Sequence, residues 1–292
     1  TARNGVTEVA LFARLAARRV IVQHIGVMMG GANLDGAEEA AKLAAAAQVR
    51  LAGLKFMSAS GAEGSPTARR VRIGLASGLD CAFHVTELEE LEEALDLIAL
   101  ARTQLAGRET GAVARIEHGG VITAEHLTRL AALGAWVVTN PGFIHFRGAK
   151  YMAEPGLGEH LYPARSLKRA HVEIAGATDA PVTPPRPLAA IAAAVSRATL
   201  DGDVLGAEER LSTAEAFALF THDAARLARL DAGVIAPQLS ADLIVLARNP
   251  MELTPSELAN LAVDITIIGG RVVYERGRPA LAWSNSADLH TA

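Results

Sequence analysis

Cysteine is almost absent from the 292-residue chain, which has only Cys81. One thiol excludes an internal disulfide framework and a zinc site made from clustered cysteines, and it suits a reducing compartment. Apolar stretches such as Ala189–Val195 are alanine-rich and much shorter than the roughly 20 residues that cross a bilayer. No signal-peptide pattern is found either. We therefore expect a soluble, cytoplasmic protein without a membrane partner.

Long runs of lysine or arginine are also missing, and the net charge is -4. Without a basic stripe the chain has nothing to bind a phosphate backbone, so we expect no nucleic-acid partner. Half of the residues are hydrophobic, which suffices for one large core, alone or with a small appendage.

Short apolar segments alternate with helical patterns, which is typical of βα units around a parallel sheet. Capping-box patterns mark helix starts at Thr86 with Glu89 and at Ser212 with Glu215, and Gly134 is placed to end a helix. We predict seven strands, near Gly5–Val9, Val20–Val27, Gly53–Met57, Asp80–Val85, Ala112–Glu117, Ala135–Thr139 and Glu173–Ala177.

This α/β pattern predicts a (β/α)8 TIM-type barrel that lacks one strand. It would occupy residues 1–232. Residues 233–283 are richer in β patterns, at Ala241–Leu246, Val263–Ile268 and Arg271–Tyr274, and Gly269-Gly270 fits a two-residue hairpin turn. We assign them to a small accessory β-sandwich, and residues 284–292 to a flexible tail.

Four polar residues follow the apolar parts of separate predicted strands: Lys55, His84, His118 and Asp179. Strand ends converge on one rim of a barrel, so these side chains can meet although they are far apart in sequence. Imidazole nitrogens and carboxylate oxygens are the usual ligands of zinc and similar divalent ions. The pattern predicts a metal site at the rim.

Each residue also has a simpler interpretation. A strand-end histidine is often held by a backbone carbonyl, Asp179 could start a turn before Pro181, and Lys55 could extend into solvent. Two histidines at matching strand ends, together with an aspartate, favour ligands; for Lys55 the alternatives stay open. Glu117 is expected to orient a neighbour or to face the helices, because adjacent strand residues point to opposite faces.

The segments Phe83–Val85, Arg115–His118 and Thr178–Val182, followed by Pro187-Leu188, resemble the amidohydrolase superfamily in its family-three branch, which includes N-substituted formamide deformylase-like hydrolases. Ser240–Leu246 and Ile267–Tyr274 resemble the strands that return to the small sandwich of that family. The resemblance implies that His84 and His118 ligate one metal from strands five and six. It implies that Asp179 on strand eight is a ligand and the general base, and that Lys55 is a carboxylated lysine bridging two metals.

The chain departs from that family because no His-x-His pair occurs in it. Gly5–Val9 resembles the second barrel strand and His24 lies on the expected third strand, so we expect the missing pair to belong upstream of Thr1. We expect the chain as printed to be catalytically incomplete, with an open barrel of about seven strands that could associate with identical chains.

The segment after the seventh barrel strand, from Asn140 to Arg147, could form a substrate wall in which Arg147 pairs with a substrate carboxylate; a solvated loop is the alternative. We assign Asn140 and Arg147 to substrate binding. The remaining histidines lack partner spacing and are expected at the surface: His126, His160, His171, His222 and His290.

The leading functional hypothesis is hydrolysis of a C–N bond in a small-molecule amide, N-acyl or N-formyl substrate, with one or two divalent ions, preferably zinc. A second hypothesis uses Lys55 as a Schiff-base nucleophile. A third makes the chain an inactive binding module that holds no metal tightly.

Overall fold

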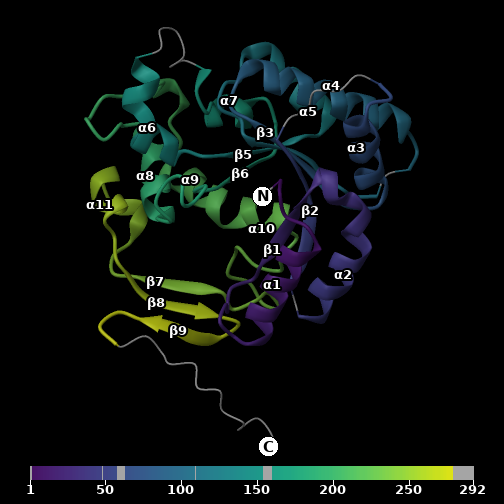
Figure 1. The fold of residues 1–292 in the computed structure, drawn as a ribbon. Coiled ribbons are helices and arrows are strands. Elements are labelled where there is room, and N and C mark those ends of the chain that lie inside the picture. Colours follow the sequence, from purple (N-terminus) through teal and green to yellow (C-terminus); the bar gives the residue numbers. More distant parts are fainter. Residues whose placement is uncertain (1, 48, 58–62, 109, 154–159, 279–292) are drawn as a thin grey trace, which may run out of the picture.

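A parallel β-sheet forms the centre of the molecule in the computed structural model, which describes residues 2–47, 49–57, 63–108, 110–153 and 160–278 (Figure 1). Within these residues the sheet has six strands that pair in chain order. They are β1 (Gly26–Gly30), β2 (Arg50–Phe56), β3 (Asp80–Val85), β4 (Ala114–His118), β5 (Trp136–Thr139) and β6 (Ile174–Gly176).

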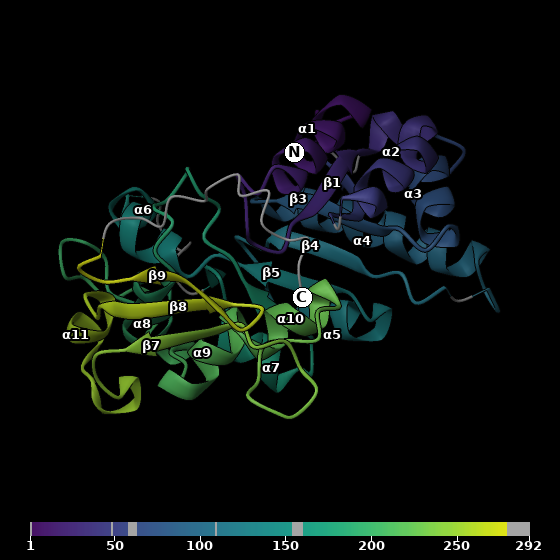
Figure 2. The same cartoon turned by 90° about the horizontal axis from the view of Figure 1, so that it is seen from below.

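Helices connect successive strands, as expected for βα units. Helix α1 (Val6–Ala17) precedes β1, and the connections contain η1 (Gly31–Gly36), α2 (Ala37–Ala46), α3 (Pro66–Ala76), α4 (Leu88–Gln104), α5 (Ala124–Leu133), α6 (Gly142–Met152) and α7 (Ala164–Arg169). After β6 come α8 (Pro187–Ser196), η3 (Ala207–Glu209), α9 (Thr213–Phe220) and α10 (His222–Ala228). Figure 2 shows α1–α3 at one side of the molecule and α8 and α9 at the other.

Alternation along the strands separates a helix-facing side from an inner side. Leu54 of β2 and Cys81 of β3 both lie against Gly74 of α3, within the main hydrophobic core. Because successive strand residues point to opposite faces, Lys55 and His84 belong to the inner side. The alternation that directs Leu54 and Cys81 into the core therefore directs Lys55 and His84 to the opposite face of the sheet.

The amino-terminal end of the sheet is closed by α10. Arg229, which follows α10, donates to both carboxylate oxygens of Asp80 on β3 at 3.0 and 2.7 Å, and to the carbonyl of Gly111 at 2.8 Å. Asp80 is 2% exposed and also accepts the N–H of Val113 at 2.9 Å. Arg50 of β2 donates to the Ala228 carbonyl. These bonds tie the end of the helix to the first residues of β2 and β3 and to the connection that leads into β4.

A separate antiparallel sheet follows, with β8 between β7 and β9 (Figure 1). Its strands are β7 (Leu243–Leu246), β8 (Val263–Ile268) and β9 (Arg271–Glu275), and η4 (Pro250–Glu252) and α11 (Pro255–Ala259) lie between β7 and β8. Gly269 and Gly270 have φ values of 55° and 77°, so the predicted hairpin turn at this pair is confirmed.

The amino-terminal strand prediction is wrong, because Gly5–Val9 lies at the start of helix α1. The Gly5 N–H donates to the Glu8 carboxylate at 2.7 Å, which caps the helix, and Val9 and Ala13, one turn apart, are its buried residues. The prediction of a strand at Val20–Val27 is displaced too, since β1 begins at Gly26. His24 therefore precedes the strand.

The remaining strand predictions agree with the structure within a few residues, and Asp80–Val85 and Val263–Ile268 match β3 and β8 at both ends. The capping box at Ser212 and the left-handed Gly134 are confirmed. The box predicted at Thr86 is shifted by one residue, because Glu87 is the N-cap and Glu90 reaches back to it.

Six parallel strands are present among the described residues, instead of the seven predicted, and β1 and β6 are not paired with each other there. The parallel sheet and its helices agree with a TIM-type arrangement. The predicted tail at residues 284–292 and His290 lie outside the described residues.

Candidate metal centre

Two histidines face each other at the carboxyl ends of neighbouring strands. His84 is the next-to-last residue of β3, and His118 is the last residue of β4. The Nδ1 atom of His84 is 3.0 Å from the Nε2 atom of His118, and the two rings meet edge to face with centroids 4.6 Å apart. The structure thus brings together the two imidazoles that the sequence predicts to meet.

Asn140 fixes the His118 ring from its other side. This residue directly follows β5 and is 2% exposed. Its Oδ1 is 2.8 Å from Nδ1 of His118, and its Nδ2 donates to the Ala177 carbonyl at 3.0 Å. With the amide oxygen as acceptor, His118 carries its proton on Nδ1 and presents a lone pair on Nε2. That is the form in which a histidine ligates a metal.

Lys55 lies on the same inner side, among charged residues that strands β2 and β4 bring together. Burial lowers the pKa of Lys55 to about 8, opposed by the negative charge of Glu117 and reinforced by the positive charge of Arg115. Glu117 itself pairs with Arg115 two residues before it. The sequence leaves two interpretations of Glu117, and the structure shows it paired with Arg115 and acting on Lys55 through its charge.

Asp179 follows β6 and is close enough to act electrostatically on this group, since its charge raises the pKa of both Lys55 and His84. Burial, together with electrostatic interaction with His118 and Lys55, lowers the pKa of His84 overall. In the part of the chain that the structure describes, Asp179 forms no hydrogen bond or ion pair with either histidine. Among the described residues, one group of three potential ligand atoms lies within 4.8 Å of one another. It is on α4 and α5 and does not include Asp179 or the histidine pair.

The backbone at this rim adopts uncommon conformations. His118 has a φ of 74° and Asp179 a φ of 55°. A non-glycine residue in the left-handed region costs on the order of 1 kcal/mol or more and persists where its surroundings enforce it. Both strained residues stand where a strand gives way to a connection at the rim.

Arg147 is connected to the same rim by the Phe143 ring, which contacts both Arg147 and His118. The segment from Asn140 to Arg147 is not a loop, because helix α6 begins at Gly142 and buries Phe143. The Phe143 ring stacks on His118 with centroids 6.0 Å apart, and the Arg147 guanidinium lies 5.2 Å from the centre of the Phe143 ring. A cation over an aromatic face is attracted by its quadrupole.

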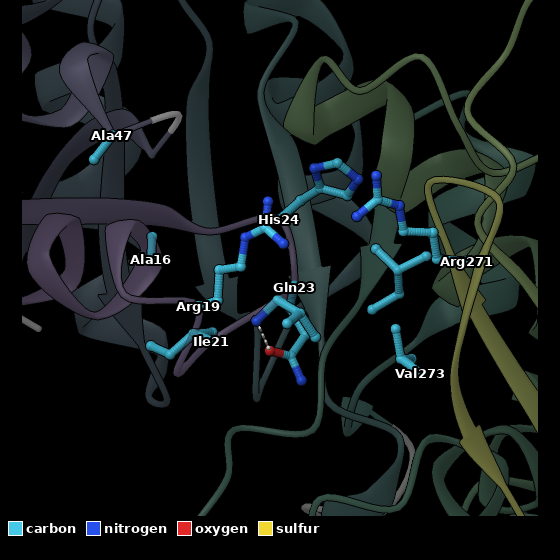
Figure 3. Close-up of a pocket in the computed structure, with 10 residues that line it drawn as sticks. Ala16, Arg19, Ile21, Gln23, His24, Ala47, Arg271 and Val273 are labelled. Carbon is cyan, nitrogen blue, oxygen red and sulfur yellow. Dashed lines mark hydrogen bonds between the residues drawn. The ribbon is translucent and has the colours of Figure 1, made fainter. Parts of the chain in front are cut away.

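His24 has no part in this rim. It lies in the connection before β1, where its Nε2 is 2.9 Å from the Asp242 carboxylate. Figure 3 shows Arg19 and Arg271 extending toward it, in a cavity of about 270 Å³ between the α1–β1 connection and the β8–β9 hairpin. His160, His171 and His222 are exposed as predicted. His126 is buried, which corrects the prediction of a surface residue.

Comparison with known proteins assigns the family. Residues 7–274 match the profile of the Amidohydrolase family. The chain belongs to the amidohydrolase family. It is 30% identical over 204 residues to an N-substituted formamide deformylase from Arthrobacter pascens, which covers 68% of this chain and 37% of the deformylase. The chain spans about two-fifths of the length of the curated relatives that it matches.

Solved structures with the same fold agree with this assignment. An uncharacterized metal-dependent hydrolase from Pyrococcus horikoshii OT3 superposes with a TM-score of 0.67 at 21% identity, over 84% of this chain and 55% of the other. Ochratoxinase from Aspergillus niger gives a TM-score of 0.57 at 18% identity, over 84% and 55%. At these identities the likeness establishes the fold of this amidohydrolase. Among its described residues, no helix combines the length and apolar character needed to cross a membrane.

Proposed function

We propose that this amidohydrolase binds a divalent metal ion, zinc by preference, and hydrolyses a C–N bond in a small-molecule amide, N-acyl or N-formyl substrate. The observation that carries the proposal is the 3.0 Å approach of His84 Nδ1 to His118 Nε2. The name of the deformylase relative supports the choice of substrate class.

The donor set fits such an ion. Two nitrogens that each lie about 2.0–2.1 Å from a tetrahedral zinc ion are about 3.3 Å apart, and the two histidines are already close to that separation. Neutral imidazole is the ligand form, and the lowered pKa of His84 favours it. Asn140 supplies the outer hydrogen bond that orients a ligating ring.

The remaining residues take roles from their positions. When bound, the ion would polarise the substrate carbonyl and lower the pKa of the attacking water towards neutrality. Asp179 would accept the proton of that water on a carboxylate oxygen and deliver it to the leaving nitrogen. Lys55, whose amine is partly neutral because its pKa is about 8, would serve as a further ligand in carboxylated form. Arg147 would bind a substrate carboxylate.

Asn140 is better suited to positioning than to substrate binding. Both atoms of its amide are already engaged, one with His118 and one with Ala177. Asn140 is also only 2% exposed, so a substrate has little access to the remaining N–H of Nδ2 or the remaining lone pair of Oδ1. We therefore assign Asn140 to the support of His118.

The lowered pKa of Lys55 also favours a second candidate, a Schiff base with a carbonyl substrate. Borohydride reduction in the presence of a carbonyl compound separates the two candidates. Covalent trapping on Lys55 would support the Schiff base, whereas hydrolysis without trapping supports the metal-dependent reaction.

The test of the proposal is hydrolysis of a panel of N-formyl and N-acyl amines by zinc-loaded protein. Asp179→Asn is expected to lower kcat by roughly 10²–10⁴-fold, because general base catalysis is lost. His171→Gln, at an exposed histidine, is the matched control and should match the wild type. Because the sequence has no His-x-His pair, we expect weak zinc binding and slow turnover even in the wild type. If neither zinc binding nor turnover is detected, the inactive binding module is favoured.

A further inference from the structure

We propose that Glu92, Glu125 and His126 form a second divalent-cation site, of the zinc class, on the outer surface between α4 and α5. Each residue offers one ligand atom, and the three atoms all lie within 4.8 Å of one another. Glu92 comes from the first half of α4, and the other two come from the first turn of α5.

The buried histidine is the observation that points to a ligand. The His126 side chain is 2% exposed. Its Nδ1 is 2.7 Å from the Thr123 hydroxyl oxygen. Its Nε2 has no hydrogen bond among the described residues, and the Glu92 carboxylate oxygen is 3.7 Å away, beyond hydrogen-bond length. The imidazole is therefore fixed on one side and directs its other nitrogen at the carboxylates.

One tautomer of His126 leaves the space between the three groups without a positive charge or a hydrogen-bond donor. If Nδ1 donates to Thr123, Nε2 presents a lone pair to two carboxylates, and the site is purely electron-rich. Neither carboxylate is paired with lysine or arginine in the described residues, and the nearby Arg129 pairs with Asp96 at 2.6 Å. Either a proton on Nε2 or a bound cation would relieve the repulsion, and the two give different experimental outcomes.

The donor chemistry selects the cation. One imidazole nitrogen with two carboxylate oxygens suits zinc and its first-row neighbours, whereas magnesium and calcium prefer oxygen donors alone. Glu92 is 55% exposed, so water has room to complete the coordination. The outer hydrogen bond from Nδ1 to Thr123 is the contact that usually orients a metal-binding histidine.

A cation here would join two helices that position the candidate metal centre. Helix α4 follows β3, which carries His84, and α5 follows β4, which carries His118. The helices already contact each other, and a shared ion would stabilise that contact in the folded state only. The expected consequence is a zinc-dependent rise in melting temperature that does not depend on the histidine pair at the rim.

The experiment is a zinc titration by calorimetry, together with melting temperatures, on the wild type, Glu125→Gln and the control Glu93→Gln, in a His84→Asn background. Glu125 and Glu93 are both exposed, so neither change threatens folding. We expect Glu125→Gln to weaken zinc binding at least roughly tenfold and to abolish the zinc-dependent rise in melting temperature. Glu93→Gln should keep both.

Nuclear magnetic resonance of the His126 ring decides between the ion and the proton. Zinc should shift or broaden the ring signals in the wild type and in Glu93→Gln, but not in Glu125→Gln at the same zinc concentration. Equal zinc affinity and equal thermal stabilisation in Glu125→Gln would overturn the proposal. So would His126 signals that respond to pH but not to zinc.

Discussion

The Asn140 side chain forms the hydrogen bond to Nδ1 of His118, and this contact makes a prediction at the scale of one residue. Asn140→Leu removes the acceptor of the Nδ1 proton and leaves a buried donor unpaired. We expect zinc affinity to fall by about 10–100-fold, as is typical when the outer partner of a metal ligand is lost. Asn140→Asp, which keeps the acceptor oxygen, should retain more affinity than Asn140→Leu. A zinc titration of both variants measures this, and equal affinities would contradict it.

Lys55 gives a pH-dependent prediction. Its pKa is lowered from 10.5 to about 8 mainly by burial, so between these values the unfolded chain binds a proton that the folded chain releases. Burying the charged amine therefore destabilises the fold below about pH 8, and this penalty disappears as the pH rises toward 10.5.

The variant Lys55→Met lacks the penalty at every pH. We expect it to be more stable than the wild type at pH 7, by about 2–3 kcal/mol at most, with the difference shrinking by pH 10. Urea unfolding of metal-free protein at both pH values measures it. A stability difference that does not change with pH would mean that folding does not lower the pKa of Lys55.

Residue-level reasoning predicted the histidine pair because the ends of the two strands are visible in the pattern around His84 and His118. It could not assign Asn140, because an amide between two partners 22 and 37 residues away in sequence leaves no local signal. His126 was predicted at the surface for a similar reason: the side chain lies on a helix whose burial depends on contact with α4.

At the scale of elements, α10 is anchored to the sheet by the pair of Arg229 and Asp80. Arg229→Gln would leave the carboxylate of Asp80, which is 2% exposed, without the positive charge of its guanidinium partner. We expect a loss of about 2–3 kcal/mol in the free energy of unfolding, slightly less than for a fully buried pair because Arg229 is partly exposed. The control is Arg226→Gln, whose partner Glu173 is exposed, and it should cost under about 1 kcal/mol. Equal losses in thermal or urea unfolding would show that the anchor contributes little.

Most strands were predictable, and one helix was misread as a strand. The strands β3 to β6 are short, largely buried segments bounded by recognisable helix starts and ends. The segment Gly5–Val9 is short and contains β-branched residues, which favour a strand locally. Its helical character becomes visible only over the longer spacing from Val6 to Ala13 and in the cap that Glu8 provides.

At the scale of the whole molecule, the small sheet leaves apolar side chains exposed. Ile244, Val245, Val272 and Tyr274 are 44–49% exposed. Exposed apolar side chains on a sheet favour association, so we expect this chain to form dimers or larger assemblies as its concentration rises. Val272→Lys should shift the distribution toward monomer, and sedimentation velocity measures it. A monomer at all concentrations would contradict this expectation.

The central claim, that His84 and His118 bind one divalent ion, is tested most directly by anomalous diffraction from crystals of zinc-loaded protein. The account predicts a strong zinc peak between Nδ1 of His84 and Nε2 of His118, with both distances near 2.0–2.1 Å, and loss of that peak in His118→Asn. Zinc bound elsewhere while the two nitrogens remain hydrogen-bonded to each other would contradict it.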